Sequence, residues 1–89
     1  MMYQYMILAD GTEITHTHIF EEDGVQKVEV YFERPKDGGF DCARCQLPGY
    51  IWQKREGYTD SDMKILDDLM HSNAHLFYKY AACGGVQIA

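Results

Sequence analysis

The stretch from Tyr58 to Gly85 constrains the fold most, because it is the only part of the chain with the pattern of a long amphipathic helix. Thr59 is a suitable N-cap residue, and Asp62 stands three residues later, where it completes a capping box. Beyond it, apolar residues recur at three- and four-residue spacing and polar residues fill the opposite side. The apolar set consists of Met63, Leu66, Leu69, Met70, Leu76, Phe77 and Tyr80.

Gly84 and Gly85 mark the end of this helix, because residues without a Cβ atom favour a left-handed C-terminal cap. We therefore expect a helix over about residues 60–82. Asn73 is the exception in the pattern, since a rotation of about 100° per residue places it within the apolar stripe. A buried amide needs hydrogen-bond partners, so we expect Asn73 to meet polar groups beneath the helix.

The chain before the helix has the pattern of β-strands. Runs rich in β-branched and aromatic residues lie at about 3–8, 13–20, 25–33 and 40–47, with 50–53 as a fifth short strand or a packed loop. The sequence therefore predicts an α+β fold in a single domain, residues 1–89, with strands over about residues 3–53. Its sheet is an antiparallel β-meander of three to five strands, with one long C-terminal α-helix packed on one face.

The first turn, Asp10-Gly11, predicts a two-residue hairpin loop. The register that follows places six side chains on one side of the sheet, in the facing pairs Ile7 with Ile14, Tyr5 with His16 and Tyr3 with His18.

The second turn allows two registers, which differ in the side of the sheet that Val28, Val30 and Phe32 occupy. A two-residue Asp23-Gly24 loop places these three residues on the side of the sheet away from the histidines. A three-residue loop that begins at Glu22 places them on the same side as the histidines. We choose the three-residue loop, because it gathers most apolar side chains on one side.

His16 and His18 project from the same side of a regular strand, since they are two residues apart. With Tyr3, Tyr5 and Asn73 they form the candidate ligand-binding site. Two imidazoles could also bind a metal ion, but two ligands do not complete a zinc site. We favour a structural role, as buried histidines that are hydrogen-bonded to tyrosine hydroxyls or to the backbone.

Two further pairs have spacings that metal sites use. His71 and His75 are four residues apart on the predicted helix, but Ser72 stands where the zinc-protease motif requires Glu. Cys42 and Cys45 form a C-x-x-C motif within a strand-like run, where thioredoxin-type motifs do not occur. The four residues are weak metal candidates, because the histidines lie on the outer side of the helix. We expect no metal and no cofactor.

Composition limits the partners of this chain. Its formal net charge is −6 and its eight basic residues are scattered, so we do not expect nucleic-acid binding. No run approaches the ~20 apolar residues of a membrane span, and the N-terminus lacks the features of a signal peptide. An odd number of cysteines, three, fits a reducing compartment, and we expect a cytoplasmic protein. Seven tyrosines favour an interface, either in a homodimer or with an unknown protein partner.

Three segments of the chain resemble a group of short uncharacterised bacterial proteins, mostly from Gram-positive anaerobes and often encoded on mobile elements. These segments are THTHIFEEDGVQKVEVYFERP, LPGYIW and the NAHLFYKYA ending of the helix. More remotely, the order of histidine-bearing strand, hairpin, Leu-Pro segment and C-terminal helix is similar to small domains of unknown function encoded beside toxin-antitoxin genes. The resemblance spans nearly the whole chain and implies an α+β fold and an intracellular bacterial origin. It brings no assigned activity.

The sequence contains no phosphate-binding Gly-rich loop, nucleophile elbow or EF-hand loop. We therefore expect a small non-enzymatic protein-interaction or regulatory module. The alternative is a ligand- or metal-binding protein, or a small enzyme, that uses His16 and His18.

Overall fold

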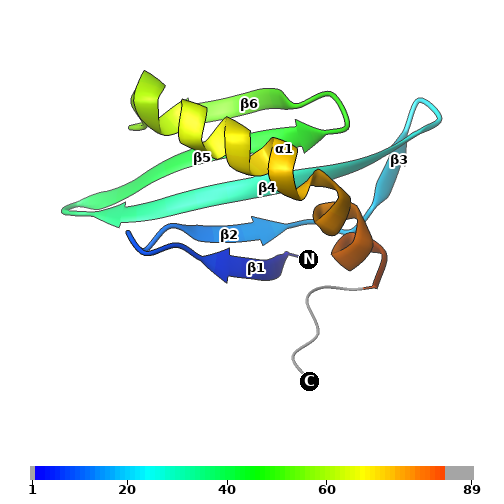
Figure 1. Ribbon diagram of the computed structural model, residues 1–89, viewed down its shortest axis with the longest axis horizontal. Helices are drawn as coiled ribbons and strands as arrows, with labels where there is room; N and C mark the ends of the chain where they lie inside the picture. Colours follow the sequence, from blue (N-terminus) through cyan, green and yellow to red (C-terminus); the bar gives the residue numbers. More distant parts are fainter. Residues whose placement is uncertain (1, 84–89) are drawn as a thin grey trace.

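Figure 1 shows the computed structural model of the chain, which describes residues 2–83. One long helix packs on an antiparallel sheet, so the predicted α+β class is confirmed. Within the described part the sheet has six strands, which exceeds the predicted three to five because residues 13–20 divide into two short strands. The elements are β1 (Tyr3–Ile7), β2 (Glu13–His16), β3 (Phe20–Glu22), β4 (Val25–Lys36), β5 (Gly39–Leu47), β6 (Ile51–Glu56) and α1 (Asp60–Cys83).

The strands follow the order β1-β2-β4-β5-β6, and β3 pairs with β4 beyond the end of β2. Every pairing is antiparallel. The central strand, β4, is the longest at 12 residues, while β1 and β6 form the two edges. The helix runs across one face of the sheet from the β6 side towards the β2 side (Figure 1). We call the side under α1 the covered face and the other side the open face.

The hydrophobic core lies between α1 and the covered face. Residues of β4 alternate along the strand, so that every second side chain is buried there. Burial of this apolar surface is the main contribution that holds helix and sheet together. The core consists of Ile14, Val28, Val30, Phe32, Ala43, Cys45 and Leu47 from the sheet, Tyr58 from the loop before the helix, and Leu66, Met70, Phe77 and Ala81 from the helix.

The start of α1 is the predicted capping box. The Thr59 backbone N–H donates to the Asp62 carboxylate (3.0 Å), and the Asp62 N–H donates to the Thr59 hydroxyl (3.2 Å). The helix runs from Asp60 to Cys83, as predicted. The predicted glycine cap at 84–85 lies outside the described residues. Among the residues that the structure describes, no helix has both the length and the apolar character needed to cross a membrane.

The loop between β1 and β2 has three residues, so the predicted two-residue loop is wrong. The Leu8 N–H donates to the Thr12 carbonyl at 2.8 Å, which leaves Ala9, Asp10 and Gly11 as the loop. Gly11 adopts a φ of 89°, a conformation that favours glycine. The Asp10 carboxylate accepts a hydrogen bond of 2.9 Å from the Thr12 N–H and stabilises this longer loop.

The longer loop changes which residues face each other in the first hairpin. Ile7 pairs with Glu13 rather than Ile14, and it lies on the open face. A register shift beside Tyr5 adds one residue to β1, so Tyr3 pairs with His16. The predicted facing pairs are therefore wrong.

The loop between β3 and β4 has two residues, so our choice of a three-residue loop is wrong as well. Glu22 pairs with Val25, and Asp23-Gly24 is the loop. Both loop residues have positive φ angles, 53° and 77°, as a type I′ turn requires.

The prediction that Val28, Val30 and Phe32 share the side of His16 is nevertheless confirmed. His16 pairs with Val30, and regular pairing from there would bring residue 19 opposite Lys27, yet Phe20 occupies that position. Residues 17–19 thus contain one extra residue, which compensates for the shorter loop.

Two strands are longer than predicted. β4 continues through Pro35 to Lys36, where β5 but not β2 lies beside it. Proline is tolerated in a strand with one neighbour, because its missing N–H can face water. β6 extends to Glu56, beyond the predicted end at residue 53.

Candidate functional site

His16 is fully buried between β2 and α1. Its Nδ1 lies 2.9 Å from the Thr17 carbonyl, an acceptor, so Nδ1 carries the proton and donates. The other ring nitrogen, Nε2, is then an acceptor, and it has no hydrogen-bond partner within the described part of the chain. The rings of Tyr3, Tyr5 and Phe77 surround it at centroid distances of 5.6, 6.4 and 6.2 Å.

His18 is exposed, so the prediction that both histidines lie on the core face is wrong for this residue. It belongs to the irregular segment between β2 and β3, where the alternation of sides is interrupted. The Tyr3 hydroxyl contacts Nε2 of the His18 ring, and the two rings pack edge to face with their centroids 4.7 Å apart. His16 and His18 therefore contact one tyrosine but do not share a buried site.

Asn73 lies on the inner side of α1, as predicted, and it is half-buried. Its Oδ1 accepts a hydrogen bond of 2.8 Å from the Tyr5 hydroxyl, and its Nδ2 donates to the Leu69 carbonyl at 2.9 Å. Burial raises the pKa of Tyr5, so this hydroxyl keeps its proton at neutral pH. The sequence thus brought Tyr5 and Asn73 together correctly, and the pair connects β1 to the helix.

The outer histidines of α1 are separate from this cluster. His71 stacks on the Tyr50 ring, with centroids 3.8 Å apart and 13° between the planes, and its Nε2 lies 3.5 Å from the Asp67 carboxylate. His75 is exposed. Among the described residues, no three His, Cys, Asp or Glu side chains are placed to hold a metal ion together.

Cys42 and Cys45 point to opposite sides of β5. Cys45 pairs with Val30 and is buried on the covered face, whereas Cys42 pairs with Glu33 and lies on the open face. Side chains that are three positions apart on a regular strand project from opposite faces of the sheet, so the two thiols cannot chelate one ion. Burial raises the pKa of Cys45 to about 12 and also raises that of Cys42. Both thiols are protonated and weakly nucleophilic at neutral pH.

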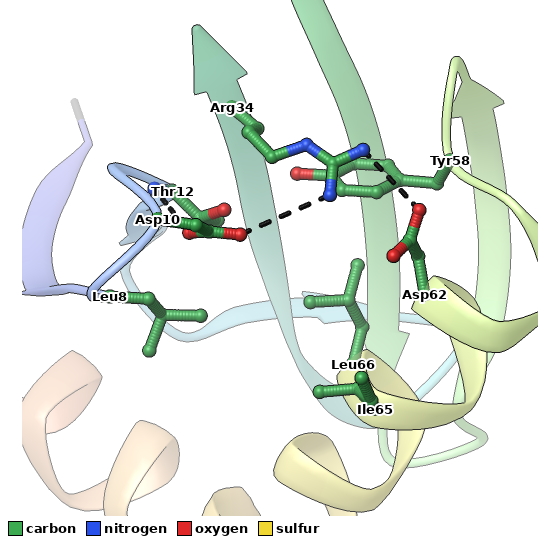
Figure 2. Close-up of a pocket in the computed structure, with 8 residues that line it drawn as sticks. All are labelled: Leu8, Asp10, Thr12, Arg34, Tyr58, Asp62, Ile65 and Leu66. Carbon is green, nitrogen blue, oxygen red and sulfur yellow. Dashed lines mark hydrogen bonds and ion pairs between the residues drawn. The ribbon is translucent and has the colours of Figure 1, made fainter.

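A charged cluster around Arg34 joins four separate segments of the fold (Figure 2). The guanidinium donates to Asp41 through Nε and Nη2 at 3.0 and 2.7 Å, and Nη2 also donates to Asp62 at 3.3 Å. Asp10 lies 3.9 Å from Nη1, and the Tyr58 ring lies under the guanidinium at 4.5 Å. The cluster connects the first hairpin, β4, β5 and the start of α1.

The three carboxylates of this cluster have pKa values below their usual range. Thr12 lowers the pKa of Asp10 through hydrogen bonds, Lys36 and then Arg34 lower that of Asp41, and Thr59 and then Arg34 lower that of Asp62. This cluster could not be predicted from the sequence, because its members are far apart in the chain and Arg34 belongs to no recognisable motif.

The Arg34 cluster borders a small pocket, which has Leu8, Ile65 and Leu66 as its apolar walls (Figure 2). Its volume of about 50 Å³ holds a few water molecules at most. The Tyr58 hydroxyl points towards Thr12 and is buried without a hydrogen-bond partner among the described residues. The pocket is too small for a substrate or a drug-sized ligand, which requires about 300–1,000 Å³. We interpret the Arg34 cluster as structural.

The larger depression lies on the open face and has a volume of about 360 Å³. Phe40, Tyr31 and Cys42 supply its apolar and aromatic surface, and Phe40 is 58% exposed. The Arg44 guanidinium lies 5.6 Å from the Tyr31 ring and donates to the Tyr31 hydroxyl at 3.4 Å. The charged residues Glu33 and Lys54 also line it. We call this depression the open-face groove.

Five charged residues of the open face lie in two neighbouring transverse rows, and Glu29 lies in the next row, where it accepts a hydrogen bond from Gln46. The acidic row contains Glu13 on β2, Glu33 on β4 and Glu56 on β6, which are in register across the sheet. Cys42 on β5 lies between Glu33 and Glu56. The basic row contains Arg44 and Lys54, which face each other across β5 and β6. Alternation along a strand shows no difference between a solvated and a binding surface, so these rows could not be predicted from the sequence.

Comparisons with family models, with curated proteins and with solved structures found no match to this chain. The resemblance to short bacterial proteins therefore stays a prediction.

Proposed function

We propose that the protein is a small non-enzymatic protein-interaction module, and that the open face of its sheet is the binding surface. The observation that carries this proposal is the open-face groove, which an exposed Phe40 lines together with Tyr31 and Arg44. Aromatic residues and arginine are the types that contribute most to binding energy at protein interfaces.

The open-face groove is preorganised for binding. Arg44 is held against Tyr31 by a hydrogen bond and by cation–π contact, so its long side chain has little freedom left to lose when a partner binds. The groove lies on paired strands rather than on a loop, which fixes the spacing of Tyr31, Phe40 and Arg44.

The chemistry of the groove supports binding rather than catalysis. Cys42 is its only thiol among the lining residues, and its raised pKa leaves little of the reactive thiolate at neutral pH. Glu33 and Lys54 lie in the open-face rows among charges of both signs, as expected for a surface that recognises a partner by complementary charge.

The test is a comparison of two exposed apolar residues on opposite sides of the molecule. Phe40 lies on the open face, and Ile65 lies on the helix with 63% of its surface exposed. The wild-type protein, Phe40→Ser and Ile65→Ser are immobilised in equal amounts and exposed to a lysate of the cells that encode the protein. Retained proteins are quantified by mass spectrometry, and bound partners are confirmed with purified components.

We expect Phe40→Ser to reduce retention of specific partners about tenfold or more, because the loss of an interface aromatic costs about 1.4 kcal/mol or more. Ile65→Ser should retain partners as the wild type does. Equal retention by all three proteins would contradict the proposal, as would a loss confined to Ile65→Ser.

A second candidate function, ligand or metal binding by the histidines, is favoured by one observation, the unpartnered Nε2 of buried His16. A buried acceptor without a donor is costly, and a bound group would relieve that cost. Calorimetric titration of Zn²⁺ or Ni²⁺ into protein purified without an affinity tag tests the metal version. Binding that is lost in His16→Phe and kept in His75→Ala would support it, and no binding at all would contradict it.

A further inference from the structure

We propose that the partner of the open face is a second copy of this chain, docked face to face about a two-fold axis. This inference rests on the proposed function, because it takes the open face to be the binding surface. It adds the identity of the occupant and the geometry of the contact.

Like charges face each other at two places on the open face. Glu13 faces Glu33 across β2 and β4, and Arg44 faces Lys54 across β5 and β6. Like charges directly opposite each other destabilise a sheet. Within the described residues, neither member of the acidic pair forms an ion pair. Lys54 forms one with Glu56 at 3.9 Å, and Arg44 reaches a carboxylate, Glu29, only through the Tyr31 hydroxyl. A covering surface of suitable charge would relieve both repulsions.

The two rows of the open face carry opposite charge. They are neighbours, two residues apart along the strands, which corresponds to about 7 Å. A two-fold axis that lies between the rows and parallel to them exchanges their positions. The acidic row of each copy then covers the basic row of the other, and Glu56 of one copy faces Lys54 of the second copy.

Arg44 of one copy lies over Cys42 of the second copy, between its Glu33 and Glu56. Glu13 lies over Thr15 and gains no basic partner. The isologous contact therefore brings Glu33 and Glu56 of each copy to basic residues of the other.

Apolar side chains flank the two charged rows, with Phe40 beyond the acidic row and Ile51 beyond the basic row. Phe40 and Ile51 lie on this face and are 58% and 56% exposed. Stacked sheets lie about 10 Å apart, a spacing that side chains of this size fill. In the docked pair these residues and Tyr31 would be removed from water.

The size of the face predicts the strength of the contact. Five strands about 4.8 Å apart and about 20 Å long give a face on the order of 500 Å² per copy, against about 800 Å² in a stable interface. We therefore expect a weak dimer with a dissociation constant of about 10–100 µM.

The experiment is sedimentation equilibrium from about 10 µM to 1 mM, with 150 mM salt at neutral pH. The wild type should approach twice its 10.3 kDa mass at the highest concentrations. Lys54→Glu and Glu56→Lys each place like charges against the other copy, and each should raise the dissociation constant about tenfold or more. The charge swap, Lys54→Glu with Glu56→Lys, should restore it to within about threefold of the wild type. Lys64→Glu, on the exposed side of α1, matches the change in net charge of Lys54→Glu and should have no effect.

Urea unfolding of each variant establishes that it is folded before its molecular mass is measured by sedimentation. A wild type that stays monomeric at 1 mM would overturn this inference, while the proposed function would stand if Phe40→Ser still lost a different protein partner. A dimer that persists equally in every variant would also overturn it, as would a double variant that fails to recover.

Discussion

The Tyr5 hydroxyl donates a hydrogen bond of 2.8 Å to Asn73, and this bond joins the first strand of the sheet to the middle of the helix across 68 residues of chain. The amide of Asn73 is satisfied at both ends, since its Nδ2 donates to the Leu69 carbonyl. A polar residue within an apolar stripe is thereby accommodated without an unpaired group.

Tyr5→Phe removes the donor and leaves the Asn73 carbonyl oxygen without its partner. We expect a loss of about 1 kcal/mol in the free energy of unfolding, measured by urea denaturation. Tyr5→Phe combined with Asn73→Leu replaces both partners by apolar groups and should recover most of that loss. A single variant as stable as the wild type would show that the hydrogen bond does not stabilise the docking of α1.

Gly57 is the glycine at which a side chain is least tolerated. It has a φ of 85°, and a Cβ atom there would lie 1.9 Å from the Asp41 carboxylate, which Arg34 and Lys36 hold in place. Gly57→Ala should lower the free energy of unfolding by about 2–4 kcal/mol.

Gly24→Ala is the matched control, because Gly24 has a similar φ of 77° but nothing within 4 Å of the added atom. It should cost about 1 kcal/mol, the strain of the left-handed conformation alone. Equal losses in the two variants, again from urea denaturation, would mean that the clash with Asp41 is relieved without cost.

The Arg34 cluster predicts a loss of stability in acid. Asp10, Asp41 and Asp62 have folded-state pKa values below their usual range, so the unfolded chain binds protons more readily than the folded one. Their contribution is complete above the unfolded pKa of about 4, and it is lost as the pH falls through the folded values.

Arg34→Gln removes donors to two of these carboxylates and should reduce the difference between the urea midpoints at pH 7 and pH 3. Arg55→Gln is the control, because Arg55 pairs with the fully exposed Asp60 and should leave that difference unchanged. An unchanged pH dependence in Arg34→Gln would contradict the role of the cluster.

Sequence reasoning succeeded where a pattern is local. The Thr59–Asp62 capping box, the buried stripe of α1 and the inward position of Asn73 follow from spacing along a single helix, and the structure has all three. The class of the fold follows from the same kind of signal, a change of period from two to 3.6.

The first hairpin loop has three residues instead of the predicted two, and the second has two instead of the predicted three. Asp-Gly occurs in both loops, and the sequence does not reveal what surrounds it. After β1, the Asp10 side chain bonds Thr12 and lengthens the loop, whereas Asp23 itself takes a positive φ in the tight turn. One extra residue in the irregular segment 17–19 then places Val28, Val30 and Phe32 on the side of His16 after all. The same irregularity leaves His18 exposed. The open-face groove depends on pairing between distant strands, which spacing within one strand cannot show.

The three thiols should differ in reactivity in dilute solution. Cys83 is exposed at the end of α1, Cys42 is half-buried with a raised pKa, and burial raises the pKa of Cys45 to about 12. Alkylation by iodoacetamide at pH 8, followed by peptide mass spectrometry, should modify them in that order. Rapid modification of Cys45 would contradict its place in the core.

Cys42 also reports directly on the central claim, that the open face is a protein-binding surface, because its thiol lines the open-face groove. The deciding measurement is its alkylation rate at about 10 µM and at 1 mM protein, with Cys83 as the internal reference. We predict that the rate at Cys42 falls severalfold at the higher concentration, relative to Cys83, as a second copy covers the groove. A ratio that stays constant, both at 1 mM and after addition of any protein whose retention depends on Phe40, would contradict the claim.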